Sequence, residues 1–227
     1  MFKQVKNKFI NFDYVQFLKN IWEDFFKFPL YIMTHPFKGW EDLKFDKKGK
    51  YHVAIIYIFL LVITSALQIT ASGFLVSLPF VGNYSIVRTF FLITVPILLI
   101  TLGNWSITSL FDGKGNMGEI FKVIAYAIIP LVWVGIPMTI LSNFLIQEEL
   151  AIYTTINSIG VFLTGYMGLF GLLVIHEYGL AKTLVTIIAT IVAVAVIIFV
   201  GLLILTLFQQ VFGFIDQVYN EFIMRNS

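Results

Sequence analysis

The sequence predicts an all-α protein: a polytopic bundle of about five transmembrane helices, with an amphipathic interfacial helix at each end. Two observations support this prediction. The chain of 227 residues is 59% hydrophobic but only 12% charged, and its mean hydropathy is +0.89. Its apolar residues also gather in long runs, whereas a soluble domain of this size needs a surface of charged and polar groups.

Five apolar stretches are long enough to cross a bilayer, which takes about 20 mostly apolar residues. We expect these spans at residues 51–71, 85–110, 121–145, 151–175 and 181–208. The chain then divides into a cytoplasmic amphipathic N-terminal region, a five-helix transmembrane domain and an extracytoplasmic amphipathic C-terminal helix. These three parts cover residues 1–50, 51–208 and 209–227.

The basic residues predict the orientation, because Lys and Arg near the ends of spans favour the cytoplasmic side. Thirteen lysines lie before the first span or close to the loops after the second and fourth spans, and only Arg88 and Arg225 lie on the other side. We therefore expect a multi-pass protein of the cell membrane, with a cytoplasmic N-terminus and an extracytoplasmic C-terminus. The abundance of residue types with AT-rich codons, such as Lys, Ile and Phe, indicates a bacterial source.

Both ends of the chain carry an apolar stripe at near-helical spacing, with polar residues between its members. The N-terminal stripe comprises Phe2, Val5, Phe9, Phe12, Phe17, Ile21, Trp22, Phe25 and Phe26. The C-terminal stripe comprises Phe208, Val211, Phe212, Ile215, Val218, Tyr219, Phe222 and Ile223. Amphipathic helices of this kind lie in the headgroup layer of a bilayer. We expect the first to contact lipid, and the second either to lie on the outer surface or to dock a partner.

No catalytic, cofactor-binding or metal-binding residues are predicted. The chain has no Cys, which excludes disulfides and thiol nucleophiles. His176 and Glu177 begin like a zinc-protease motif, but Leu180 stands where the second His is needed, so we interpret both as loop polarity. No ionisable residue is predicted near the bilayer centre, which argues against a proton-coupled pump. The net charge of +2 is too small to indicate a nucleic-acid partner.

The glycine-rich segment 112–119 is expected to form a tight cytoplasmic turn between the second and third spans. It lacks the Gly-Lys-Ser/Thr ending of a phosphate-binding loop. Lys114 also occupies a position that a calcium loop gives to an oxygen ligand. We predict that its glycines supply positive φ angles.

Small residues predict how the spans pack. Gly160, Thr164 and Gly168 recur every four residues and form a ridge on the fourth span, which lets a neighbouring helix approach closely. Pro130 and Pro137 lie seven residues apart in the third span and are expected to kink it. We interpret these kinks as packing features, with a gate as the alternative.

The chain resembles the Yip family of five-span membrane proteins, named for eukaryotic proteins that interact with Ypt/Rab GTPases. The resemblance rests on the predicted five spans, on the segment His35-Pro36-Phe37-Lys38-Gly39-Trp40, and on the glycine-rich turn followed by FKVIAYAIIP at residues 121–130. It runs from Pro29 onward and leaves the two amphipathic stripes unmatched. The resemblance implies no catalytic residues. Some bacterial members of the family look like neighbours of sugar ABC transporters. Eukaryotic members act in vesicle traffic, and we do not expect that role for a bacterial chain.

We therefore expect a non-enzymatic scaffold or accessory subunit that contacts the lipid bilayer and binds another membrane protein, with a sugar ABC transporter subunit as the partner that the resemblance implies. The alternative is a small transporter or channel. Two surfaces are candidates for the partner: the segment with His35, Pro36, Phe37 and Trp40, and the C-terminal stripe with Val211, Ile215, Tyr219 and Phe222. If the first segment docks a partner, Trp40 is the expected anchor, because Trp is common at binding hot spots. The alternative is that its aromatic residues only lie in the headgroup layer, as Trp often does.

Overall fold

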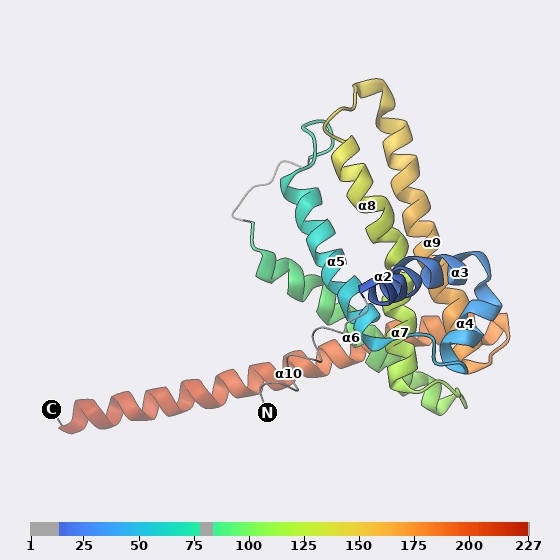
Figure 1. Cartoon of the computed structure of the whole chain (residues 1–227). Coiled ribbons are helices and arrows are strands. Elements are labelled where there is room, and N and C mark those ends of the chain that lie inside the picture. The colour runs from blue at the N-terminus through green and yellow to red at the C-terminus, as the bar shows by residue number, and fades with distance from the viewer. Residues whose placement is uncertain (1–13, 78–83, 227) are drawn as a thin grey trace, which may run out of the picture.

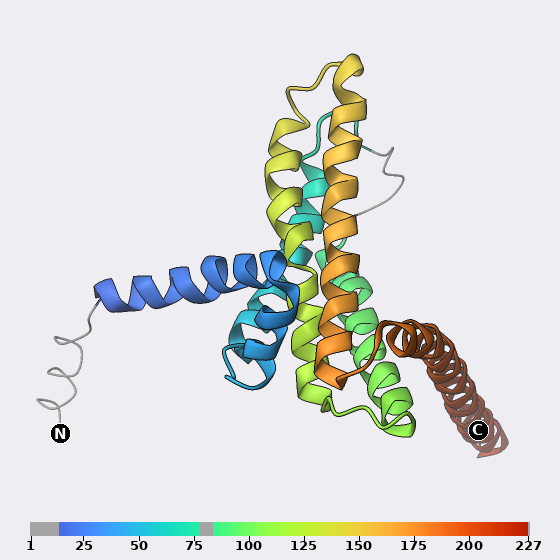
Figure 2. The same ribbon diagram turned by 90° about the vertical axis from the view of Figure 1, so that its right-hand side faces the viewer.

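The computed structural model describes residues 14–77 and 84–226, all of whose regular elements are helices. Four short helical segments come first and form an arm against the side of the bundle (Figures 1 and 2). They are α2 (Tyr14–Trp22), the π-helix η1 (Glu23–Lys27), α3 (Phe28–Thr34) and α4 (Pro36–Lys44). Of the N-terminal stripe, Phe2, Val5, Phe9 and Phe12 lie outside the described residues.

Prolines set the boundaries within this arm. Pro29 and Pro36 lie in the first turns of α3 and α4, where a missing N–H costs no helical hydrogen bond. His35 between these helices has a non-helical backbone (φ −129°, ψ 71°), in line with the bias of the residue before a proline away from the helical region. The arm therefore turns at Pro36, which brings α4 back against the bundle.

Five helical stretches in the described chain are long and apolar enough to cross a membrane, which confirms the predicted number of spans. Their bounds agree with the prediction to within about four residues, except that the fifth stretch continues to Arg225 instead of ending near residue 208. The first two are α5 (Tyr51–Thr70) and α6 (Ile86–Leu110). The third, Met117–Leu141, comprises α7 (Met117–Ala127) and α8 (Ile129–Leu141). The fourth runs through the 3-10 turn η2 (Gln147–Glu149) and α9 (Leu150–His176), and the fifth is α10 (Leu180–Asn226).

Kinks were predicted at two prolines of the third span, Pro130 and Pro137, and the helix is interrupted next to the first of them only. α7 ends at Ala127, and α8 starts at Ile129 with Pro130 in its first turn. Pro137 lies inside α8, which continues to Leu141. The helix is therefore interrupted at Ile128, just before Pro130, whereas it continues through Pro137 without a break.

Loops from alternate spans meet at the two ends of the bundle. At one end, Lys44 and Lys114 both contact Glu177, which joins the segments before α5, after α6 and after α9. At the other end, Ser142 Oγ accepts a hydrogen bond from the backbone N–H of Gly73 at 2.9 Å. These contacts place the three lysine-bearing segments on the same end, as five alternating spans require.

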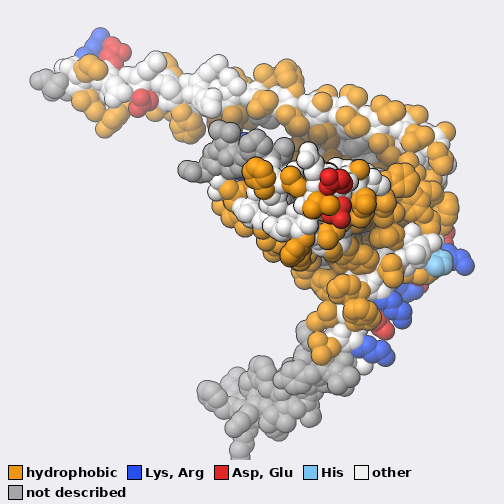
Figure 3. Space-filling model, turned by 90° about the horizontal axis from the view of Figure 1, so that it is seen from above, with side chains coloured by type: hydrophobic (Ala, Val, Ile, Leu, Met, Phe, Trp, Pro, Cys, Tyr) orange, Lys and Arg blue, Asp and Glu red, His pale blue; other side chains and the backbone are white. Residues whose placement is uncertain are grey.

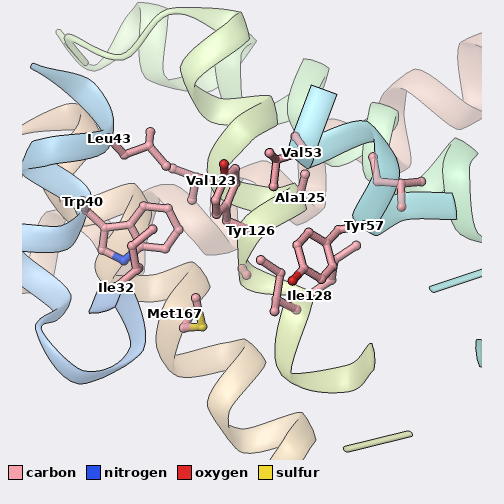
Figure 4. Packing of buried hydrophobic residues seen from close by; sticks show 14 of the residues in the cluster. Ile32, Trp40, Leu43, Val53, Tyr57, Val123, Ala125, Tyr126, Ile128 and Met167 are labelled. Carbon is pink, nitrogen blue, oxygen red and sulfur yellow. The ribbon is translucent and has the colours of Figure 1, made fainter. Parts of the chain in front are cut away.

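The core lies where α4, α5, α7 and α9 converge (Figure 4). Trp40, Tyr57 and Tyr126 are its largest side chains, and each is at most 2% exposed. The core also contains Ile32, Leu43, Val53, Val123, Ile129, Met167 and Ile175. The N-terminal arm therefore belongs to the folded core through α3 and α4 and is more than a surface anchor.

The arm docks on the spans at its π-helix. The Tyr57 hydroxyl donates to the Phe25 carbonyl, and Trp133 Nε1 donates to the same hydroxyl at 3.2 Å. The Lys50 ammonium pairs with Asp24 at 2.6 Å. A π-turn widens the helix locally and is often found at functional positions. Here the π-helix itself contains the Phe25 carbonyl and the Asp24 carboxylate, the two groups through which the arm contacts Tyr57 of α5 and Lys50 just before it.

α10 leaves the bundle at a steep inclination to α8 and α9 (Figures 1 and 2). The C-terminal stripe is helical as predicted, but it continues the fifth span as one helix of 47 residues without a break at residue 208. Every side chain from Ile198 to Arg225 is exposed. Figure 3 shows that apolar side chains cover this helix along most of its length.

Candidate functional site

A buried polar junction joins α6, α9 and α10 at the lysine-bearing end of the bundle. It consists of Asn104, His176, Thr190 and the backbone of Gly115. His176 Nε2 lies 3.0 Å from Asn104 Oδ1, and Asn104 Nδ2 donates to Thr190 Oγ1, also at 3.0 Å. His176 and Asn104 are each 1% exposed. The junction therefore supplies hydrogen bonds to groups that have no water within reach.

The hydrogen bonds of the junction fix the protonation of the histidine. The Gly115 N–H donates to His176 Nδ1 at 3.3 Å, so this nitrogen is an acceptor and Nε2 carries the proton. Nε2 then donates to Asn104 Oδ1. The Thr190 hydroxyl, which accepts from Asn104, donates in turn to the Thr186 carbonyl at 2.7 Å. A second proton on Nδ1 would face the Gly115 N–H without an acceptor. The arrangement fits a neutral, structural imidazole.

The glycine-rich loop is shaped by this histidine, which corrects the prediction that its glycines supply positive φ angles. In the loop, the left-handed residue is Asp112, with φ 55°. A Cβ at Gly113 would lie 2.7 Å from His176 Nδ1, and one at Gly115 would lie 2.3 Å from Ile175 Cγ2. Glycine is therefore needed here for close approach to the end of α9, not for backbone conformation.

Glu177 ties three segments together beside the junction. It caps α9 in the left-handed region, with φ 55°, and its carboxylate pairs with Lys114 at 2.6 Å and Lys44 at 2.9 Å. Hydrogen bonds from these lysines hold the pKa of the Glu177 carboxyl below its usual value. Lys44 also donates to the Ile175 carbonyl at 2.8 Å, so it satisfies one of the free carbonyls at the end of α9.

His176 and Glu177 were expected to be loop polarity, and for His176 this was wrong. It is the last residue of α9 and lies inside the protein. Sequence reasoning missed the junction because its members lie 72 and 86 residues apart along the chain. A signal was present: Asn104 and Thr190 are polar residues within apolar spans, and such residues commonly hydrogen-bond across helices.

In the segment with His35, Pro36, Phe37 and Trp40, Trp40 is buried whereas His35 and Phe37 are exposed. Trp40 is fully buried, so it cannot be the exposed anchor that was predicted. Its ring packs on the bundle because Gly171 leaves room: a Cβ at Gly171 would lie 3.1 Å from two ring carbons. Phe37 is 52% exposed and touches Phe170 edge-on at 5.2 Å, and His35 stacks on Tyr31 at 5.0 Å. Partner binding through Phe37 and His35 stays a prediction.

The ridge of Gly160, Thr164 and Gly168 lies on α9. A Cβ at Gly160 would lie 3.3 Å from Val134 Cβ, and one at Gly168 would lie 3.8 Å from Ala127 Cβ. The Thr164 hydroxyl donates to the Gly160 carbonyl of its own helix at 3.0 Å. The closest approach is one turn away at Gly171, where a Cβ would lie 2.5 Å from Val123 Cγ1. The stability contribution of the ridge stays a prediction.

The second candidate surface, the C-terminal stripe, extends from the bundle into open space. Val211, Ile215, Tyr219 and Phe222 are between 55% and 67% exposed. Gly213 has no atom near the position that a Cβ would occupy. Asp216 and Asn220 interact on the other side of the helix at 3.3 Å. The stripe therefore presents an apolar face that no described part of the chain covers.

Comparison with known protein families supports the resemblance predicted from the sequence. The family model described as the Yip1 domain matches residues 30–205. Comparisons with curated proteins and with solved structures gave no match. The matched range starts in α3, contains the polar junction and reaches the middle of α10. Because this match covers most of the chain and touches all five candidate spans, the chain belongs to the Yip1 domain family of membrane proteins.

Proposed function

We propose that the chain is a non-enzymatic scaffold or accessory subunit that binds a helix of another membrane protein along the distal half of α10, residues 198–225. The observation that supports this is the exposure of every side chain in this half. The helix of 47 residues has a length of about 70 Å, whereas a span takes about 20 residues. Lipid alone does not require so long an apolar helix.

The chemistry of the distal half favours a helical partner within or beside the bilayer. Its apolar stripe is bordered by the amide side chains Gln209, Gln210, Gln217 and Asn220 and by the charged residues Asp216, Glu221 and Arg225. Amphipathic helices bind grooves through anchors at this spacing, and amide side chains hydrogen-bond across helices in membranes. The partner class to test first is a sugar ABC transporter subunit, which the likeness to bacterial family members favours.

Site-specific photo-crosslinking in native membranes tests the proposal. A photoreactive residue at Val211 or Tyr219 should give an adduct with one protein of a mass different from this chain. The matched position Gln217, on the other face of the helix, should not. Adducts with lipid only, or with a second copy of the chain, would contradict the proposal. Solute flux in vesicles that contain the purified chain alone would favour the transporter alternative.

We also propose that the lysine-bearing end faces the cytoplasm of a bacterial cell. The positive-inside rule supports this orientation, since three lysine-bearing segments meet at one end. Single cysteines at Lys48 and Lys114 should resist an impermeant thiol reagent in whole cells, and those at Ser77 and Glu148 should react. Labelling at Lys114 from outside would reverse the orientation.

A further inference from the structure

A basic pocket of about 520 Å³ lies between the segment before α5 and the start of α7. Four lysines line it, Lys44, Lys47, Lys50 and Lys122, together with one carboxylate, Glu119. Glu119 belongs to the capping box of α7, in which its carboxylate accepts the Asn116 N–H at 3.0 Å. The pocket wall therefore carries an excess of positive charge.

Two of these lysines have no carboxylate partner among the described residues. Lys44 pairs with Glu177 and Lys50 pairs with Asp24. Lys47 and Lys122 take part in none of the ion pairs of the described chain. Lys122 is only 7% exposed, and its ammonium reaches the Gly49 carbonyl at 3.4 Å and lies 5.1 Å from the centre of the Tyr51 ring. Glu119 attracts the Lys122 ammonium electrostatically but forms no ion pair with it in the described chain. The four lysines therefore leave an excess of positive charge that is unfavourable near a buried wall, so this pocket fits an anion.

The position of the pocket indicates which anion. It lies where two candidate spans begin, at Tyr51 and Met117. Spans enter the hydrocarbon at the depth of the lipid headgroups, where Tyr and Lys side chains are common. The pocket is thus at the level of lipid phosphates, and basic pockets between membrane helices on the cytoplasmic side bind anionic headgroups.

An apolar lateral groove adjoins the basic pocket. It has a volume of about 950 Å³ and lies between the N-terminal arm and the spans α5 and α8. Phe25, Ile56, Leu60 and Ile136 are among its lining residues. Lys50 and His52 line both the groove and the basic pocket, so the two share a wall. An occupant with a charged head and an apolar tail would fill both.

We propose that the basic pocket binds the phosphate of an anionic phospholipid and that the lateral groove holds one of its acyl chains. Lys47 and Lys122 supply the charge that the phosphate compensates. The shared wall places the glycerol region beside Lys50 and His52. This inference does not depend on the proposed scaffold function, because its residues lie outside the distal half of α10, but it rests on the proposed cytoplasmic orientation of the lysine-bearing end.

Binding of phosphatidylglycerol to the purified full-length chain in mixed micelles tests the headgroup part. Lys47→Gln should weaken binding about fivefold, the equivalent of about 1 kcal/mol for one basic residue near an anionic surface. Lys47 is exposed, so this variant should fold normally. Lys38→Gln removes the same charge from an exposed position outside the pocket and should leave binding unchanged. Equal effects of the two substitutions would overturn the proposal.

The groove is tested by a change of bulk. Ile136→Trp should fill part of the groove and weaken binding of phosphatidylglycerol severalfold, whereas Ile140→Trp, on the same helix but outside the groove, should not. Phosphatidylcholine should bind more weakly than phosphatidylglycerol. Inorganic phosphate at millimolar concentration should fail to displace the lipid. Displacement by phosphate, or equal binding of the two lipids, would overturn the assignment to an anionic phospholipid.

Discussion

α9 and α10 are both long apolar helices, yet only α9 is packed along its length. α9 contacts α4, α7 and α8, and buried residues recur on it from Tyr153 to His176. α10 contacts α6 and the end of α9, and its side chains past Ile197 are all exposed. The difference shows that hydropathy identifies a helix that can enter a membrane but does not decide whether that helix packs on the bundle.

Small and polar residues at the contact distinguish the two helices. Three of the four glycines of α9 face neighbouring helices, with Gly160 beside Val134, Gly168 beside Ala127 and Gly171 beside Val123, whereas Gly165 faces open space. The glycines of α10, Gly201 and Gly213, face open space. The part of α10 that does pack has buried threonines, Thr183, Thr186 and Thr190. In lipid, close backbone approach and interhelical hydrogen bonds replace the hydrophobic effect as the forces between helices.

Gly171→Leu should have the largest effect on stability. Even a Cβ at this position would lie 2.5 Å from Val123 and 3.1 Å from the Trp40 ring. Overpacking of this kind costs about 1–3 kcal/mol, and we expect the upper end because Trp40 is held on several sides. Thermal unfolding in detergent measures the loss. Gly201→Leu is the matched control on α10 and should leave the melting temperature unchanged; equal losses would mean that both helices are packed.

Asn104→Ala should have the next largest effect, because it removes the central member of the polar junction. The His176 Nε2–H then loses its acceptor, at a cost of about 2 kcal/mol for a buried group left unpaired. Hydrogen exchange should also rise in residues 183–194 of α10. Asn157→Ala removes an amide that bonds only within α9, at 2.9 Å to the Tyr153 carbonyl, and should have little effect. Unchanged exchange in α10 would show that the junction does not attach this helix.

Glu177→Gln should have a smaller effect that depends on pH. Lys114 and Lys44 lower the pKa of the Glu177 carboxyl in the folded protein relative to its usual value of 4.5. The ion pairs therefore stabilise the fold at pH above that value, and the stabilisation is lost as the pH falls through the folded-state pKa. The difference in melting temperature between wild type and variant should thus shrink below pH 4.5. A constant difference across this range would assign the effect to packing.

The sequence predicted the spans well, because each needs only a long apolar run. It also predicted a distortion of the third span at Pro130, which follows from the missing N–H of proline. It did not predict that α4 enters the core. Trp40 lies in a segment that was expected to bind a partner, and its burial depends on Gly171, which is 131 residues away in the chain.

The polar junction shows the same limit. Asn104, His176 and Thr190 each have an ordinary local explanation, and only the approach of three helices makes them one hydrogen-bonded group. The segment with Gly113 and Gly115 forms the predicted turn between α6 and α7, but the explanation by positive φ angles was wrong. The cause, the close approach of Ile175 and His176, comes from the end of α9. Local chemistry predicts elements, whereas contacts between distant elements decide which residues are buried.

Deletion of residues 209–227 should have the smallest effect on the stability of the bundle. All side chains with a described exposure in this range are exposed, and the buried threonines of α10 lie before it. We expect a change in the free energy of unfolding within about 0.5 kcal/mol, as for surface changes elsewhere. Thermal unfolding and light scattering in detergent measure stability and mass together. A marked loss of stability with a halved mass would show that two copies pack through this segment, and the contrast between α9 and α10 would then hold only for the single chain. An unchanged bundle would show that residues 209–227 contribute nothing to its stability and would keep the contrast between α9 and α10.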